Sequence, residues 1–172
     1  MTPIHDPNNY WEQLERLEKL IRASELKAGV IFSFHSLVLG LFFEKFEQLE
    51  DMLNSSIVSI VFVFLWFFSV IISIFYCFKC FKPQIELKYD KNVFFFGDAV
   101  RAFGTIEEYT KKLIEVCSTE EELYKQLGEQ IHVECKIIDA KFKCVHRSMQ
   151  FFGLSVIFVI LIIGYWLITL KY

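Results

Sequence analysis

Three long stretches without a charged residue constrain this chain more than any other feature of its sequence. They are residues 28–43, 57–78 and 151–170, and none of them contains Asp, Glu, Lys or Arg. A membrane-crossing helix needs roughly 20 apolar residues, with a usable range of about 17–25. Because no water reaches the backbone inside a bilayer, each stretch must satisfy its own hydrogen bonds as an α-helix. The sequence therefore predicts an all-α membrane protein with three transmembrane helices.

The first of these stretches leaves two questions open. It is slightly short for a membrane span and contains His35, Ser33 and Ser36, so a buried core helix is the alternative interpretation. An ionisable side chain within a membrane is a candidate functional group. A neutral histidine bonded to a neighbouring helix is the more common arrangement, and both interpretations of His35 stay open.

The basic residues predict the orientation of the three spans. The loop after the first span carries one Lys and four acidic residues within residues 44–51. Basic residues near the ends of spans stay on the cytoplasmic side. They are Arg16, Lys19, Arg22 and Lys27 before the first span, Lys79 and Lys82 after the second, and Lys141, Lys143 and Arg147 before the third. We therefore expect a membrane protein whose N-terminus and residues 79–150 are cytosolic.

The resulting organisation has six parts. It comprises a cytosolic N-terminal helix at 1–27, a first span at 28–43, a short outside loop at 44–56, a second span at 57–78, a cytosolic sensor segment at 79–150 and a third span at 151–170.

Capping signals predict that the cytosolic parts are helical and continuous with the spans. Asp6-Pro7 favours a helix start, and that helix continues through the first span. The second span is expected to end at Lys82, before Pro83. Residues 84–91 are expected to be loop-like, and a short helix is expected over Asp98–Phe103. Two capping boxes, Thr105 with Glu108 and Thr119 with Glu122, start further helices, and the last helix runs into the third span. The prediction is a helical cytosolic bundle hung from the membrane helices.

The cysteines and histidines allow two minor alternatives. Cys77 and Cys80, with His132 and Cys135, could together supply the four ligands of a zinc site. Cys77 and Cys80 also lie at a depth that permits S-palmitoylation. The default interpretation is small, buried residues. Catalytic motifs are missing from the sequence, and no basic patch indicates nucleic-acid binding. We expect no enzyme, no metal site and no nucleic-acid partner.

Two features of the sequence indicate either a ligand pocket or an ordinary structural role. The segment Phe94–Asp98 runs from three aromatics into a Gly-Asp pair. It either anchors a loop, with Asp98 capping the next helix, or offers aromatic faces to a base. An acid and a lysine also stand two residues apart twice, as Glu25 with Lys27 and Asp139 with Lys141. Those pairs are either interfacial charges with snorkelling lysines or contacts for helices or a ligand.

The order of these motifs resembles a known family. Ser24-Glu25-Leu26-Lys27-Ala28-Gly29 enters the first span, Phe95-Phe96-Gly97-Asp98 leads to Glu107-Glu108-Tyr109, and Ile138-Asp139-Ala140-Lys141-Phe142 precedes the last span. Over nearly the whole chain this is similar to the transmembrane effectors of Pycsar anti-phage defence. The family usually has Asp where this chain has Glu25.

The resemblance implies a mechanism. A cyclic nucleotide such as cUMP or cCMP binds the cytosolic part, and the protein, as a homo-oligomer, then impairs the inner membrane and causes growth arrest or cell death. The predicted ligand contacts are Phe96, Asp98, Arg101, Lys27 and Lys141. The alternative function is a membrane-anchored scaffolding protein, and a channel subunit would need several copies.

Overall fold

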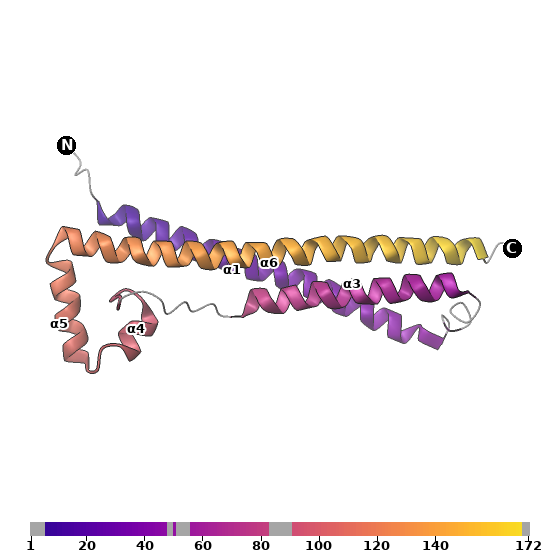
Figure 1. Cartoon of the computed structure of the whole chain (residues 1–172), viewed down its shortest axis with the longest axis horizontal. Helices are drawn as coiled ribbons and strands as arrows, with labels where there is room; N and C mark the ends of the chain where they lie inside the picture. The colour runs from indigo at the N-terminus through magenta and orange to yellow at the C-terminus, as the bar shows by residue number, and fades with distance from the viewer. Residues whose placement is uncertain (1–5, 48–49, 51–55, 83–90, 170–172) are drawn as a thin grey trace. The chain divides into compact units, whose positions relative to one another are not determined.

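The described residues are helical almost throughout. The computed structural model describes residues 6–47, 50, 56–82 and 91–169. Its helices are α1 (Pro7–Glu44), α3 (Ile57–Phe81), α4 (Phe96–Arg101), α5 (Ile106–Cys117) and α6 (Glu120–Thr169), as Figure 1 shows. The predicted all-α fold is confirmed.

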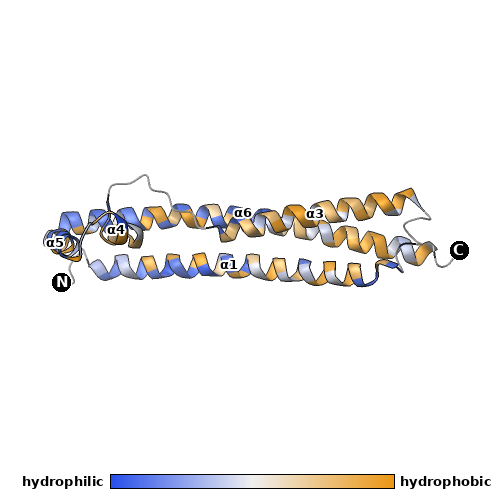
Figure 2. Ribbon diagram, turned by 90° about the horizontal axis from the view of Figure 1, so that it is seen from below, coloured by the Kyte–Doolittle hydropathy of each residue, from blue (hydrophilic) through white to orange (hydrophobic). Residues whose placement is uncertain are grey.

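Three of these helices are candidate membrane spans. By length and composition, α1, α3 and α6 are each apolar enough to cross a membrane. Figure 2 shows α3 as hydrophobic along its length, whereas α1 and α6 change from hydrophilic to hydrophobic along theirs. The prediction of three spanning helices, two of them continuous with polar helical segments, is confirmed.

The chain divides into two compact units. Unit 1 takes in described residues within 1–22 and 83–139, and unit 2 takes in those within 23–82 and 140–172. Helices α1 and α6 therefore contribute residues to both units, whereas α3 belongs to unit 2 and α4 and α5 to unit 1.

Small residues let the three helices of unit 2 pack closely. Its core consists of Ala28, Ile31, Cys77, Cys80, Cys144 and Val145, with Phe32 and Phe152 packed against them. Serines join α3 to α6: the Ser73 hydroxyl donates to the Ser148 carbonyl oxygen at 2.9 Å, and the Ser148 hydroxyl donates to the Ser73 carbonyl oxygen at 3.1 Å. Small residues and serine hydrogen bonds are the usual means of joining helices in lipid, where the hydrophobic effect is absent.

Most local helix signals act as expected. The Asp6 carboxylate accepts the Asn8 N–H at the start of α1, and Ser56 caps α3 by accepting the Val58 N–H at 3.2 Å. Helix α3 ends at Phe81 with Lys82 as its C-cap, next to Pro83 as predicted. The predicted loop at 84–91 and much of the expected loop at 44–56 lie outside the described residues.

The short helix α4 corrects one prediction. It begins at Phe96 instead of Asp98 and ends at Arg101 instead of Phe103. Phe95 is the N-cap, and its carbonyl oxygen accepts the N–H groups of Asp98 and Ala99. Asp98 therefore lies in the first turn, where a carboxylate favours the positive end of the helix dipole.

The capping box of α5 makes a direct stability prediction. The Thr105 hydroxyl accepts the Glu108 N–H at 3.2 Å, and the Glu108 carboxylate accepts the Thr105 N–H at 3.3 Å. We expect Thr105→Ala to cost about 1 kcal/mol, which is a factor of roughly five in the opening equilibrium of α5. Hydrogen exchange of the α5 amides measures this change. Thr110→Ala, an exposed position inside the same helix, is the control, and equal exchange in the two variants would contradict the prediction.

Candidate functional site

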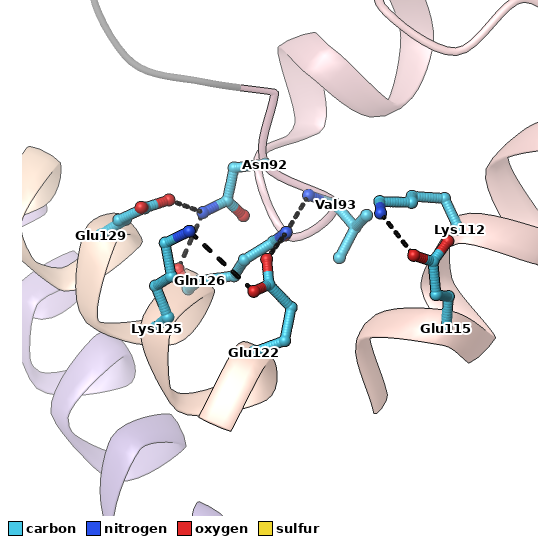
Figure 3. Close-up of polar contacts among 8 residues, drawn as sticks. All are labelled: Asn92, Val93, Lys112, Glu115, Glu122, Lys125, Gln126 and Glu129. Atoms are coloured by element: carbon cyan, nitrogen blue, oxygen red, sulfur yellow. Dashed lines mark hydrogen bonds and ion pairs between the residues drawn. The ribbon is translucent and has the colours of Figure 1, made fainter. Parts of the chain in front are cut away.

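In unit 1 the segment before α4 is anchored through its backbone. The Asn92 side-chain amide donates to the Gln126 carbonyl oxygen at 2.8 Å, and the Val93 N–H donates to Gln126 Oε1 at 3.0 Å. Figure 3 shows this segment against α6. The Asn92 N–H also donates to Asp98 Oδ2 at 3.0 Å, and the Tyr109 hydroxyl donates to the Val93 carbonyl oxygen at 3.2 Å. These bonds support the anchoring interpretation, but Asp98 receives the Asn92 N–H instead of capping α4.

The side chain of Phe94 lines a groove of about 280 Å³ in unit 1. The other walls come from α1 and α6. The full lining is Trp11, Leu14, Glu15, Glu18, Phe94, Gln130 and Glu134.

Two aromatic rings form one wall of the groove. The Trp11 and Phe94 rings lie edge to face, with centroids 5.4 Å apart and an interplanar angle of 88°. This is a favoured geometry for an aromatic pair. Trp11 is 44% exposed, so much of its ring is still available to a ligand.

The part of the lining that comes from α6 carries a carboxylate with an unmet hydrogen-bonding need. Gln130 Nε2 donates to Glu134 Oε1 at 3.1 Å, while Glu134 Oε2 is buried and has no hydrogen-bond partner among the described residues. Burial raises the pKa of Glu134 above its ordinary value, and the nearby charge of Glu18 raises it further, against the opposing effect of the Gln130 bond.

The two α1 acids that line the groove are each paired with a cation one helical turn away. Glu15 lies 3.6 Å from Lys19, and Glu18 is paired with Arg22. All four side chains are well exposed. Exposed ion pairs of this kind contribute about 0–1 kcal/mol to stability. Lys19 and Arg22 can therefore readily bind another anion.

The five predicted ligand contacts fall into two groups. Phe96, Asp98 and Arg101 lie on α4 in unit 1, where Phe96 and Arg101 are exposed, and none of the three lines the groove. Lys27 and Lys141 lie in unit 2. Their role in ligand binding stays a prediction.

Lys141 is buried where the three helices of unit 2 meet. Its ammonium donates to a Glu25 carboxylate oxygen at 2.7 Å and to the Cys80 carbonyl oxygen at 2.6 Å. Its side chain is only 4% exposed. The snorkelling interpretation is therefore wrong for Lys141. Lys27 is exposed, with its ammonium 6.0 Å from the centre of the Phe142 ring.

The structure bears on three further interpretations from the sequence. Cys77 and Cys80 are fully buried in the core of unit 2, so they are closed to palmitoylation, and the default interpretation is confirmed. No group of three or more possible metal ligands comes together among the described residues, so the zinc alternative gains no support. His35 is buried edge-on to the Phe152 ring, and its Nε2 has no hydrogen-bond partner within the described part of the chain.

Sequence reasoning missed Trp11, Gln130 and Glu134. One signal for them was present, because Glu134 stands between Ile131 and Ile138 on the apolar face of its helix. An acid at helical spacing within an apolar stripe indicates a site or a buried network.

Comparison with known families identifies the family of this chain. The family model described as the Pycsar effector protein domain matches residues 9–168. The chain belongs to the Pycsar effector family. The predicted family is thus confirmed, and membership implies a cyclic-nucleotide-activated membrane effector of anti-phage defence. No curated protein and no solved structure matches this Pycsar effector.

The buried pair of Lys141 and Glu25 predicts an asymmetric response to mutation. Glu25→Ala leaves a buried ammonium without its counter-ion and should cost about 3 kcal/mol. Lys141→Met should cost less, because the Glu25 side chain is 39% exposed and can be hydrated when left alone. Thermal unfolding of the detergent-purified variants tests this order. A greater loss in Lys141→Met than in Glu25→Ala would contradict it.

The raised pKa of Glu134 predicts the pH dependence of stability. The folded state holds the proton on the Glu134 carboxyl group more tightly than the unfolded chain does. The contribution of Glu134 to the free energy of unfolding therefore falls as the pH rises from about 4.3 towards the raised pKa. Glu134→Gln removes this loss and should raise the free energy of unfolding at pH 7. Unfolding measured from pH 4 to pH 8 tests the effect, with Glu121→Gln on the exposed surface of α6 as control. A variant with the wild-type pH slope would refute the assignment.

Proposed function

We propose that this protein senses a cyclic nucleotide in the bacterial cytosol and impairs the inner membrane when the nucleotide binds, which causes growth arrest or cell death during phage infection. The observation that carries this proposal is the family match over residues 9–168, which takes in both units. The protein acts as a sensor and not as an enzyme. The family resemblance favours cUMP or cCMP as the activating ligand.

The proposed topology follows the distribution of charge. Residues 28–43, 57–78 and 151–170 span the membrane, and the N-terminus and residues 79–150 are cytosolic. The three candidate spanning helices support this arrangement, as do the basic residues at one end of each span. Unit 1 then supplies the ligand-binding part.

The proposed signal travels along two helices. Helices α1 and α6 each run without a break from residues of unit 1 to residues of unit 2. A ligand shifts a conformational equilibrium only if it binds one state more tightly than the other. A ligand that favours one arrangement of the cytosolic parts of α1 and α6 therefore changes their membrane parts through continuous backbone hydrogen bonds. Three charge-free spans make a poor pore alone, so several copies act together.

The alternative, a membrane-anchored scaffolding protein, has one observation in its favour. Ile106 and Ile114 of α5 are 79% and 65% exposed. Exposed apolar surface often marks a protein contact. Binding of a cyclic nucleotide distinguishes the two functions, because a scaffold has no need of it.

The proposal predicts selective nucleotide binding that is linked to membrane damage. Calorimetric titration of the detergent-purified protein with cyclic mono-, di- and trinucleotides should show one ligand bound at micromolar or tighter affinity. In vesicles held at a membrane potential, that ligand should release the potential, and a cyclic nucleotide that does not bind should leave it unchanged. If the folded protein binds none of these nucleotides, the result contradicts the proposal and favours the scaffolding function.

A further inference from the structure

We propose that the groove formed by Trp11, Phe94, Gln130 and Glu134 receives the base of a cyclic mononucleotide. This inference rests on the proposed function and adds the place and the means of recognition. Neither the family match nor the predicted contacts on α4 point to this groove.

The size of the groove favours one nucleotide. Its volume is about 280 Å³, just below the roughly 300–1,000 Å³ typical of small-molecule pockets. A single base fits in such a space and leaves its ribose and phosphate at the rim. A cyclic di- or trinucleotide would leave most of its surface outside.

The aromatic wall provides a stacking surface. Trp11 meets Phe94 edge to face, so the Phe94 ring steadies the indole without covering both of its faces. Base stacking on an aromatic side chain tolerates any base and contributes about 1–3 kcal/mol. Leu14 extends the apolar lining below these rings.

The polar wall matches the edge of a base. Among the described residues the Gln130 side chain is bonded only to Glu134, which leaves it one N–H donor and its carbonyl oxygen. Glu134 has a buried carboxylate oxygen without a partner, and a change in the side-chain torsions that precede the carboxylate turns this oxygen into the groove in the bound state. A base that offers an N–H beside an acceptor satisfies both residues, and it removes the cost of an unmet buried acceptor.

The rim resolves the apparent conflict between an acidic lining and an anionic ligand. Glu15 and Glu18 are paired with Lys19 and Arg22, which reduces the net negative charge along the groove. Because the Glu18–Arg22 pair is exposed, the Arg22 guanidinium keeps N–H groups that can donate to the phosphate while it stays paired with Glu18.

Titration of matched variants tests the groove. The full-length protein in detergent is titrated with cUMP, cCMP, cAMP, cGMP and a cyclic dinucleotide. Trp11→Leu and Glu134→Gln should each weaken the binding of the preferred mononucleotide about tenfold or more. Glu121→Gln, an exposed acid on the same helix outside the groove, should bind like the wild type. Thermal unfolding shows that each variant is folded.

The outcomes separate the groove from the function. Loss of affinity in both groove variants, with the control unchanged, supports the inference. Normal affinity in the folded groove variants overturns it while the proposed function stands, and no binding by the wild type overturns both. A second readout is the part of the nucleotide-induced tryptophan quenching that is lost in Trp11→Leu, because Trp66 and Trp166 also contribute to the fluorescence. Equal quenching in the wild type and in Trp11→Leu would overturn the inference.

Discussion

The buried ammonium of Lys141 sets the arrangement of the three helices in unit 2. A charge away from water requires full compensation, and here it comes from one carboxylate on α1 and one carbonyl oxygen on α3. The Cys80 carbonyl lies in the last turn of α3, where carbonyl groups lack an intrahelical partner and the helix dipole is negative. One cation therefore satisfies the end of α3 and fixes the register of α1 and α6 beside it.

The rest of unit 2 follows from that close meeting. Ala28, Cys77, Cys80 and Cys144 are small enough to let the helix backbones approach, and the reciprocal bonds of Ser73 and Ser148 lie further along the same contact between α3 and α6. Large side chains such as Phe64 and Phe75 stay exposed on the outside. This reverses the pattern of a soluble bundle and suits helices whose outer surroundings are lipid.

Unit 1 is held together mainly by polar contacts, in contrast to the close apolar packing of unit 2. Its irregular segment is held by polar side chains, chiefly Gln126, and its helix α5 begins with a capping box. The anchored backbone holds Phe94 against Trp11 and so shapes the groove. In the proposed function unit 1 is the ligand-sensitive part and unit 2 is the membrane part, and α1 and α6 contribute residues to both units.

The sequence by itself determined the elements whose causes are local. Three charge-free stretches specify three apolar helices, and Ser56, Thr105 and Pro83 mark boundaries through their neighbours in the chain. The sequence predicts the start of α4 at Asp98, which is two residues too late. The Asp98 carboxylate accepts the Asn92 N–H and does not cap the helix.

Only the tertiary structure decided the contacts between distant residues. Lys141 and Glu25 are 116 positions apart, and Trp11, Phe94 and Glu134 come from three separate segments. A sequence shows that a lysine or an acid stands on a helical face, but burial and partners depend on how faces of different helices meet. For that reason the acid pattern around Glu134 indicated an unusual position, while the groove beside it and the buried state of Lys141 emerged only from packing.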